Sequence, residues 1–274
     1  MSKIASKLLV VTGASRGIGR AAAVGLSRRL ALTDECCIRA LFIARCGAGL
    51  EKTKEMVHSA VGTRAEVEVA SLDLSDLDVV EDAIPALLRS LVELGECYSH
   101  AILINNAGSL GTLGPSESLH MGMLRSAFDL NITSCSFVSS QFASHFAKSG
   151  SATKCTIVNI SSLAAVSPFP TWGTYCAGKA ARDMFHSVLA KEMADRKGVT
   201  VINYAPGAVE TEMQVEIRGN ETGDLVIREQ MVALKERGEL VDPEETVDVL
   251  CRLVMGDVKV ESGSHVDYWD VKRK

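Results

Sequence analysis

Apolar, often β-branched runs alternate along this chain with longer segments whose apolar residues recur at helical spacing. Uninterrupted apolar runs are typical of strands buried on both faces, and the segments between them are typical of helices that cover a sheet. Strands are predicted at Lys7–Thr12, Ile38–Ala44, Glu66–Ser71, His100–Asn105, Thr156–Ile160, Thr200–Tyr204 and His265–Tyr268. The alternation predicts an α/β fold, a doubly wound seven-stranded parallel sheet with helices on both faces.

The chain is predicted to form a single domain over residues 1–274. Its 274 residues and 47% hydrophobic content suffice for a sizeable core, and no repeat, low-complexity tract or linker interrupts it. A charged stretch near 208–240 predicts a helical insertion before a last helix near Pro243–Met255. Ligands of doubly wound sheets gather at the carboxyl ends of the strands, where such an insertion could close over them. Ser75 is a plausible N-cap for a helix that runs to Leu94.

Composition excludes several classes of function. A net charge of −5 and a pI of about 5.7 argue against a nucleic-acid partner, because such proteins usually carry a basic excess. Eight cysteines without a CxxC pair or a histidine cluster predict neither a metal site nor a disulfide framework, but reduced thiols in the cytoplasm. The apolar run before Thr12 has only four residues, far fewer than a signal peptide or membrane span needs, so no membrane partner is predicted.

A tyrosine and a lysine, Tyr175 and Lys179, stand four residues apart after a predicted strand that ends at Ile160. Side chains at i and i+4 share one helix face, so the ammonium would favour the phenolate and draw the tyrosine pKa toward neutral pH. Such a tyrosine is a suitable general acid for carbonyl reduction. Ser162, next to the end of the strand, could hydrogen-bond the same substrate oxygen. On its own, this spacing more often means two exposed side chains on a helix surface.

A glycine-rich turn joins the first predicted strand to a segment with helical periodicity, in the run Thr12-Gly13-Ala14-Ser15-Arg16-Gly17-Ile18-Gly19. Glycines at a strand-to-helix turn let the backbone approach a pyrophosphate, whose charge lies at the helix N-terminus. The spacing is G-x3-G-x-G rather than G-x-G-x-x-G. Alone it could be an ordinary turn, but together with Tyr175 and Lys179 it predicts a dinucleotide site.

The TGxxxGxG motif at 12–19, the segment Asn105-Asn106-Ala107-Gly108 and the set Ser162, Tyr175 and Lys179 together resemble the short-chain dehydrogenase/reductase family. The similarity runs from about Lys7 to the C-terminus. It implies a Rossmann-like fold and a nicotinamide dinucleotide cofactor. It also implies that Asn131 holds a water molecule that connects Lys179 to solvent, although a polar side chain facing water would explain Asn131 too.

The resemblance further implies a homodimer. In the family, two helices, here around 122–147 and 175–196, pack against their copies in the partner subunit. The small residues that would allow a close approach are Ala177, Gly178, Ala180 and Ala181.

Members of this family that use NAD usually carry an acid at the end of the second strand, whereas those that use NADP carry arginines. Here Arg45 follows the strand, and Arg16 in the glycine turn can reach the same place, so NADPH is the predicted cofactor. The alternative for Arg45 is a solvated charge. Asp73 would bind the adenine edge, unless it only forms a turn. The cofactor-binding residues that the resemblance implies are Gly13, Ser15, Arg16, Gly17, Ile18, Gly19, Arg45, Asp73, Leu74, Asn106, Ala107, Gly108, Tyr175, Lys179, Pro206, Gly207, Val209 and Thr211.

Finer features, among them the segments 103–111, 175–184, 203–207 and 262–267, resemble the branch of the family that reduces side-chain ketones of pterins such as 6-pyruvoyl-tetrahydropterin in tetrahydrobiopterin biosynthesis. A pterin offers an amino group and a ring N–H side by side, a fork that one carboxylate can accept. The resemblance assigns that role to Asp267. The remaining substrate residues that it implies, beside Ser162 and Tyr175, are Leu110, Leu163, Phe169, Trp172, Met213 and Gln214.

Two other functions remain open from the sequence. One is a broad dicarbonyl reductase of the same fold that acts on diketones such as benzil. The other is a non-catalytic NADPH-binding protein that regulates a partner. The joint presence of Asn131, Ser162, Tyr175 and Lys179 disfavours the second, because a protein that only binds the dinucleotide needs no aligned acid.

Overall fold

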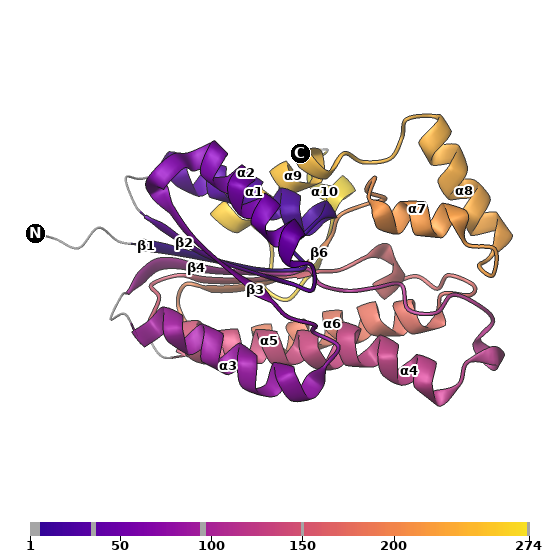
Figure 1. The fold of residues 1–274 in the computed structure, drawn as a ribbon, viewed down its shortest axis with the longest axis horizontal. Helices are drawn as coiled ribbons and strands as arrows, with labels where there is room; N and C mark the ends of the chain where they lie inside the picture. Colours follow the sequence, from indigo (N-terminus) through magenta and orange to yellow (C-terminus); the bar gives the residue numbers. More distant parts are fainter. Residues whose placement is uncertain (1–5, 34–36, 94–96, 149–150, 273–274) are drawn as a thin grey trace, which may run out of the picture.

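The computed structural model describes residues 6–33, 37–93, 97–148 and 151–272. These form one seven-stranded sheet in the order β3-β2-β1-β4-β5-β6-β7, and every neighbouring pair is parallel (Figure 1). The strands are β1 (Ser6–Thr12), β2 (Ile38–Ala44), β3 (Ala65–Ser71), β4 (Tyr98–Asn105), β5 (Cys155–Ile160), β6 (Val199–Ala205) and β7 (His265–Asp267). The predicted doubly wound parallel sheet is confirmed. Its strand order reverses between β1 and β4, which opens a crevice at their carboxyl ends.

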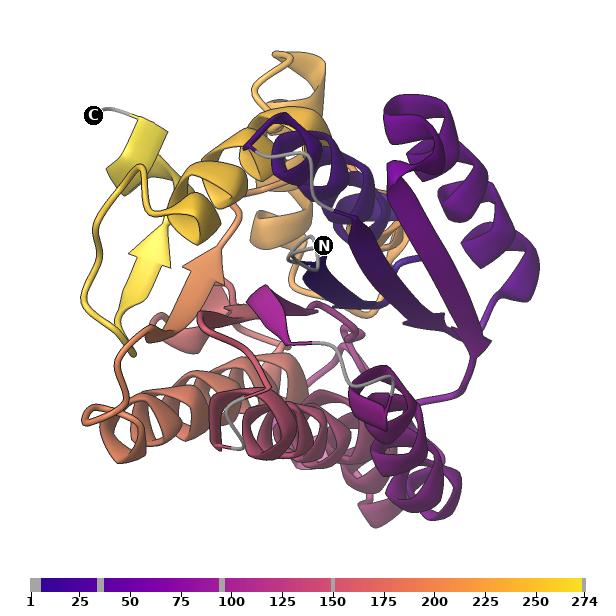
Figure 2. The same ribbon diagram turned by 90° about the vertical axis from the view of Figure 1, so that its left-hand side faces the viewer.

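Helices cover both faces of the sheet, as Figure 2 shows in the view along the strands. One layer contains α1 (Gly17–Thr33), α2 (Gly47–Val61), α9 (Pro243–Met255) and α10 (Tyr268–Lys272). The other contains α3 (Leu77–Glu93), α4 (Met121–Phe128), α5 (Cys135–Phe142) and α6 (Gly173–Glu192). Two π-helical segments, η3 (Asp129–Ser134) and η4 (Ala143–Lys148), continue α4 and α5. Three short 3₁₀ turns are η1 (Gly62–Arg64), η2 (Ser116–Ser118) and η5 (Leu163–Ala165).

The core explains why the strands carry no polar alternation. Leu9 and Val11 of β1 pack into the apolar cluster under α1 and α9, whereas Leu8 and Val10 pack into the cluster under α3 and α5. All four side chains are fully buried. A central parallel strand therefore needs apolar residues at every position.

The end of the last predicted strand is wrong by one residue. β7 stops at Asp267, and Tyr268 begins the short helix α10, which the sequence did not predict. The Asp267 carboxylate accepts a hydrogen bond from the Trp269 backbone N–H at 2.9 Å, as a helix cap does. α9 has the predicted bounds, but because α10 follows, α9 is not the last helix.

The predicted cap of α3 is also wrong. The helix begins at Leu77, and the Asp76 carboxylate, not Ser75, accepts from the backbone N–H of Val79 at 3.4 Å. The Ser75 hydroxyl instead donates to the Asp73 carboxylate at 2.7 Å. Leu94, the expected end of the helix, lies outside the described residues.

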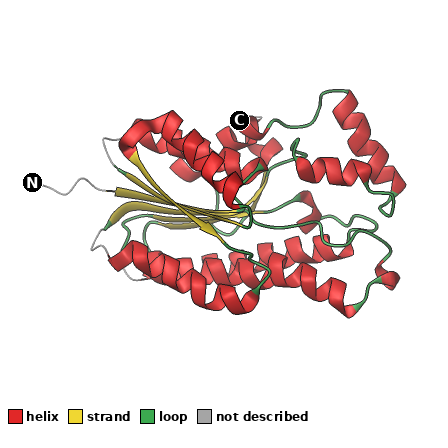
Figure 3. Ribbon diagram, viewed as in Figure 1, coloured by secondary structure: helices red, strands yellow, loops and turns green. Residues whose placement is uncertain are grey.

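Two helices extend beyond the carboxyl ends of the strands, at the right in Figure 3. They are α7 (Glu212–Gly219) and α8 (Leu225–Glu236). The hydrogen bonds that Glu210 N–H donates to Val241 O at 3.0 Å and Val241 N–H donates to Ala208 O at 2.9 Å tie together the two ends of this segment. α7 and α8 thus form a cover next to the crevice at the strand ends.

Candidate active site

The turn after β1 has a backbone that a side chain would disrupt. Gly13 and Gly17 have φ values of 67° and 53°, in the left-handed region that favours glycine. A Cβ at Gly19 would lie 2.2 Å from the carbonyl oxygen of Gly13, so only glycine lets α1 begin this close to the turn. The turn therefore exposes backbone N–H groups at the start of a helix, which is a surface that fits a pyrophosphate.

A buried threonine joins this turn to the loop after β4. The Thr12 hydroxyl accepts from the backbone N–H groups of Asn106 and Ala107 at 2.9 and 3.0 Å, and it donates to the Asn105 side chain at 3.1 Å. The Asn105 amide in turn donates to Cys135 O at 2.8 Å. The two loops that flank the crevice are held together by these bonds.

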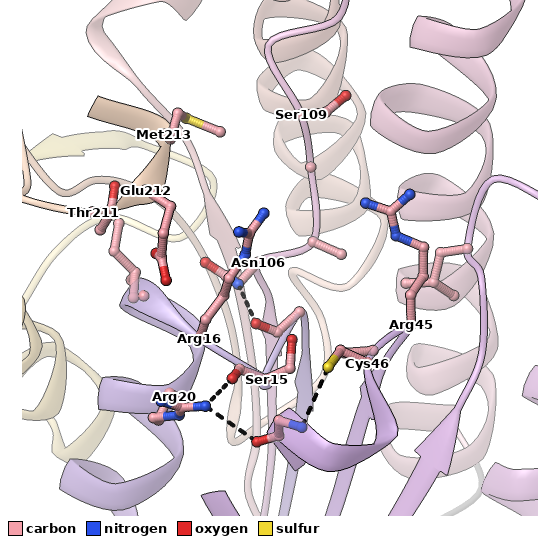
Figure 4. Close-up of a pocket in the computed structure, with 18 of the residues that line it drawn as sticks. Ser15, Arg16, Arg20, Arg45, Cys46, Asn106, Ser109, Thr211, Glu212 and Met213 are labelled. Carbon is pink, nitrogen blue, oxygen red and sulfur yellow. Dashed lines mark hydrogen bonds between the residues drawn. The ribbon is translucent and has the colours of Figure 1, made fainter. Parts of the chain in front are cut away.

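A cavity of about 720 Å³ lies along the glycine turn and the carboxyl ends of β1 to β4 (Figure 4). The predicted cofactor residues that line it are Gly13, Ser15, Arg16, Gly17, Ile18, Arg45, Asp73, Leu74, Asn106, Ala107, Gly108 and Thr211. Met213 of the predicted substrate set also lines it. The volume and the glycine floor suit a dinucleotide.

Six predicted cofactor residues do not line this cavity. Two of them, Tyr175 and Lys179, are described below, and their contact with the cofactor stays a prediction. Gly19 is packed beneath the turn, as described above. Val209 is buried and pairs with Val241, and Pro206 accepts from the Thr246 hydroxyl through its carbonyl at 2.9 Å. Gly207 has a φ of 81°. For Pro206, Gly207 and Val209, contact with the cofactor stays a prediction.

The guanidinium groups of Arg16 and Arg45 extend in the same general direction within the cavity (Figure 4). Arg45 Nη1 lies 3.9 Å from the Asp73 carboxylate, and both side chains are largely exposed. The other oxygen of Asp73 accepts from the Ser75 N–H and hydroxyl, which lowers the pKa of Asp73. Asp73 therefore forms a turn through one carboxylate oxygen, and its other carboxylate oxygen faces Arg45.

The tyrosine and the lysine of the predicted catalytic set lie together on α6. Lys179 Nζ is 5.6 Å from the centre of the Tyr175 ring and donates to the backbone oxygen of Ile160, at the end of β5, at 2.7 Å. Ser162 follows that strand, and its hydroxyl interacts with the Tyr175 hydroxyl and accepts from Ala164 N–H at 3.1 Å. The end of β5 and the helix α6 thus bring the hydroxyls of Ser162 and Tyr175 and the amine of Lys179 close together.

The groups that shift the pKa of Tyr175 differ from the one predicted, Lys179. Burial raises the pKa of Tyr175, and the opposing effects come from the Ser162 hydrogen bond and then the Arg182 guanidinium, not from Lys179. The lysine is itself buried, which lowers its pKa to about 7. The charged group that opposes the effect of burial on the pKa of Tyr175 is therefore Arg182.

Asn131 lies in η3 and is only 1% exposed, so it does not face water. Its side chain accepts from the backbone N–H of Ser109 at 3.0 Å and donates to Ser109 O at 2.9 Å. A Cβ on Gly178 would lie 3.1 Å from Asn131 Cβ. Asn131 therefore spaces α6 from the loop after β4; its predicted water stays a prediction.

Apolar and aromatic residues surround the Tyr175 ring. Trp172 stacks on Phe169 with 5.4 Å between ring centres and meets Tyr175 edge-on at 5.6 Å. Leu110 is buried in the same cluster, and Met213 Sδ lies 4.0 Å from the Tyr175 hydroxyl. Four of the predicted substrate residues, Leu110, Phe169, Trp172 and Met213, are thus brought together around Tyr175.

The other predicted substrate residues are placed differently. Leu163 is 50% exposed. The Gln214 amide donates to Met231 of α8 at 3.5 Å, and its buried oxygen has no partner among the described residues. Asp267 stands at the carboxyl end of β7, opposite Ala205 of β6, and does not line the cavity described above. It shares the edge of the sheet where the crevice opens.

Several cavity residues were missed by the sequence analysis. They are Arg20, Ala44, Cys46, Gly49, Leu72, Ser109, Leu130, Glu212 and Glu216. Glu212 and Glu216 stand four residues apart on α7, so helical spacing could have indicated one shared face. Arg20 donates to the carbonyl oxygens of Ser15 and Gly49 and so supports the glycine turn from beneath, a long-range contact without a sequence signal.

Within the described ranges, no group of three or more histidine, cysteine, aspartate or glutamate side chains is arranged to hold a metal ion. None of the helices in the described part of the chain has both the length and the apolar character needed to cross a membrane.

Comparison with known proteins supports the family that the sequence motifs resemble. The family described as short chain dehydrogenase matches residues 7–222. The sepiapterin reductase of Meriones unguiculatus is 37% identical over 265 residues, with 95% of both chains covered. The benzil reductase ((S)-benzoin forming) of Bacillus subtilis (strain 168) is 31% identical over 254 residues, 90% of this chain and 93% of the relative. The crystal structure of a short chain dehydrogenase/reductase from Saccharomyces cerevisiae superposes with a TM-score of 0.77 at 26% identity, covering 96% of both chains. The chain therefore belongs to the short-chain dehydrogenase/reductase family of nicotinamide-dependent oxidoreductases.

Proposed function

We propose that this enzyme is an NADPH-dependent reductase of the side-chain ketones of pterins, with sepiapterin or 6-pyruvoyl-tetrahydropterin as substrate, in tetrahydrobiopterin biosynthesis. The observation that carries the proposal is the position of the Ser162 and Tyr175 hydroxyls. The two hydroxyls interact with each other, the Tyr175 ring belongs to the aromatic cluster, and Lys179 Nζ lies 5.6 Å from the centre of that ring. The sepiapterin reductase relatives, matched over nearly the whole chain, support the substrate class.

The reaction assigns one role to each side chain. The bound cofactor supplies the hydride to the carbonyl carbon. Tyr175 donates a proton to the carbonyl oxygen, while Ser162 orients that oxygen by a hydrogen bond. Lys179, whose pKa is about 7, can give up and regain a proton near neutral pH beside the phenol. Asn131, buried behind Lys179, would hold the water that connects the lysine to solvent.

Arg16 and Arg45 support NADPH over NADH, since both guanidiniums line the cavity and the end of β2 carries no acid. We expect Arg45→Ala to weaken NADPH binding by about 10- to 100-fold, the effect of losing a hydrogen bond to a charged group, without weakening NADH binding. Dissociation constants from fluorescence titration with both dinucleotides measure this difference.

A matched control is Arg39→Ala, which removes an arginine from β2, the strand that Arg45 follows, at a position where the side chain pairs with Glu68 at 3.0 Å. It should leave both affinities near the wild-type values. Equal weakening of NADPH and NADH by Arg45→Ala would contradict the assignment of Arg45 to the 2′-phosphate.

A second candidate function is a broad dicarbonyl reductase. The benzil reductase relative favours it, and the aromatic cluster of Phe169, Trp172 and Tyr175 would accept benzil as readily as a pterin. The test is a comparison of kcat/KM for sepiapterin, benzil and diacetyl with NADPH. A clear preference for sepiapterin supports the pterin proposal, a preference for benzil supports the alternative, and no NADPH oxidation with any carbonyl points to a regulatory protein.

We also propose a homodimer through α6 and the α4–α5 region. Ala177, Ala180, Met184 and Val188 are exposed on one side of α6, an apolar stripe that suits a helix partner. Gly178 must be removed from the predicted interface, because it is buried against Asn131 of its own chain. The expected location of the protein, from its cysteine content, is the cytoplasm.

A further inference from the structure

Arg182 is a buried arginine to which neither the motifs nor the proposed reaction assign a role. Its side chain is 0% exposed. It donates from Nη2 to Asn105 O at 2.6 Å, from Nη1 to Ala107 O at 2.7 Å and from Nε to the Asn159 side chain at 2.7 Å. One side chain of α6 therefore binds the carboxyl ends of both β4 and β5.

The two carbonyl groups belong to the loop that borders the cavity. Ala107 and Gly108 line the cavity, and a Cβ on Gly108 would lie 3.3 Å from Arg182 Nη1. Arg182 also stands three residues after Lys179 and seven after Tyr175, so all three share one face of α6. The guanidinium thus fixes the distance between the cavity loop and the helix that carries the proposed acid.

The charge of Arg182 has no direct carboxylate partner in the hydrogen bonds of the described residues, since all three acceptors are neutral amide oxygens. The nearest acid in this network is Asp183, which accepts from the Asn159 amide at 2.9 Å and also interacts with His265 Nδ1 at 2.7 Å. Burying a guanidinium without a direct counter-ion is costly, and a neutral side chain could brace the loop as well. The buried charge itself therefore needs an explanation.

The buried charge of Arg182 acts on two neighbouring groups, the phenol of Tyr175 and the amine of Lys179. Burial raises the pKa of Tyr175 and the charge of Arg182 opposes that rise, while the same charge helps burial to lower the pKa of Lys179. The other groups that act on Tyr175 are the Ser162 hydroxyl and the Cys176 thiol. The other groups that act on Lys179 are Cys135 and Asp183, which oppose the burial effect.

We propose that Arg182 is a positioning residue for the reductase reaction, which holds the 105–108 loop against α6 and places a permanent positive charge next to the Tyr175 hydroxyl. The proposal rests on the proposed function, because it needs Tyr175 to exchange the proton. It divides the arginine into two separable parts, the hydrogen-bonding fork and the charge. Substitutions can remove the charge alone or both parts together.

The experiment compares Arg182→Gln, which removes the charge but keeps amide donors for the loop, with Arg182→Met, which removes both. Arg182→Lys is avoided, because the burial that lowers the pKa of Lys179 to about 7 would also neutralise a lysine at this buried position. The alcohol product is oxidised with saturating NADP⁺ across a range of pH. In this direction the hydride leaves the alcohol carbon for the cofactor and the hydroxyl proton passes to the Tyr175 phenolate, so the rate rises with pH through the tyrosine pKa. Without the nearby positive charge the phenolate is less favoured, and the rise should move to higher pH in both variants. Below the rise, the rate falls by about tenfold for each pH unit of displacement.

Arg182→Met should also bind NADPH about tenfold or more weakly, because it loses every donor to the cavity loop, whereas Arg182→Gln should lose less affinity. A residue that only braces the loop would change the affinity and leave the pH profile in place. A wild-type pH profile in both variants would overturn the proposal.

Two controls keep the result decisive. If Arg182→Met does not fold, as circular dichroism and thermal melting would reveal, the comparison of Arg182→Gln with the wild type still tests the charge, because the glutamine keeps amide donors for the loop. Tyr175→Phe separates this proposal from the proposed function. If that variant stays active, Tyr175 is not the acid and the proposed function fails; if it is inactive while Arg182→Met keeps the wild-type profile, only the role of Arg182 fails.

Discussion

Tyr175→Phe is expected to lower kcat for carbonyl reduction by about 100- to 10,000-fold, the usual contribution of a positioned general acid. The phenylalanine ring keeps the edge-on contact that Tyr175 makes with Trp172 at 5.6 Å and fills the same buried space. What is lost is the hydroxyl that interacts with Ser162. NADPH affinity should therefore change little. Steady-state kinetics together with a fluorescence titration of NADPH measure the two quantities separately.

The matched control is Tyr98→Phe, which removes another buried hydroxyl, one that donates to Leu91 O at 2.8 Å at the opposite, amino-terminal end of the sheet. It should cost about 1 kcal/mol of stability and leave kcat unchanged. Near-normal turnover in Tyr175→Phe would refute the role of Tyr175, whereas an equal loss in both variants would attribute the effect to folding.

Asp267→Ala is expected to raise KM for sepiapterin by about 10- to 100-fold and to leave KM for benzil nearly unchanged. In the proposed complex the carboxylate accepts two hydrogen bonds from the pterin, and charge-assisted bonds of this kind are the strong ones. Benzil has no N–H groups to donate. The kinetics of both substrates with the same enzyme preparation provide the measurement.

Asp267 also caps α10 through the Trp269 N–H, so an alanine removes two interactions at once. Asp267→Asn separates them, because the amide oxygen can still accept from Trp269 while the second acceptor and the charge are gone. We expect Asp267→Asn to raise KM for sepiapterin and to melt near the wild-type temperature. An unchanged KM in both variants would remove the argument for a pterin.

The residues that carry the proposed chemistry could be predicted from local sequence. Tyr175 and Lys179 share a helix face because of their spacing, and Gly13 and Gly17 follow a strand in the way that a phosphate-binding turn requires. The strands too were predicted to within two residues, because strands buried on both faces carry uninterrupted apolar runs. Errors occurred at the ends of elements, at Ser75 and Tyr268, where a single side-chain hydrogen bond decides where a helix begins.

The electrostatics of the site could not be predicted in the same way. From the sequence, Lys179 was the charge that favours the Tyr175 phenolate, since it is the cation in the motif. The structure buries Lys179, which lowers its pKa to about 7, and brings in Arg182 as a fixed charge. Burial and the position of a third group depend on how α6 packs on β4 and β5, which the spacing of the motif does not contain.

Local patterns along the chain therefore determined the order of strands and helices, the glycine turn and the identity of the proposed acid, because each depends on residues a few positions apart. Only the tertiary structure decided which distant residues meet. Thr12 contacts the loop after β4, Arg182 reaches two strand ends, and Met213 of α7 approaches the Tyr175 hydroxyl. These contacts join segments that are 20 to 90 or more residues apart, and the strand order and the packing of helices on the sheet, rather than any local preference, bring them together.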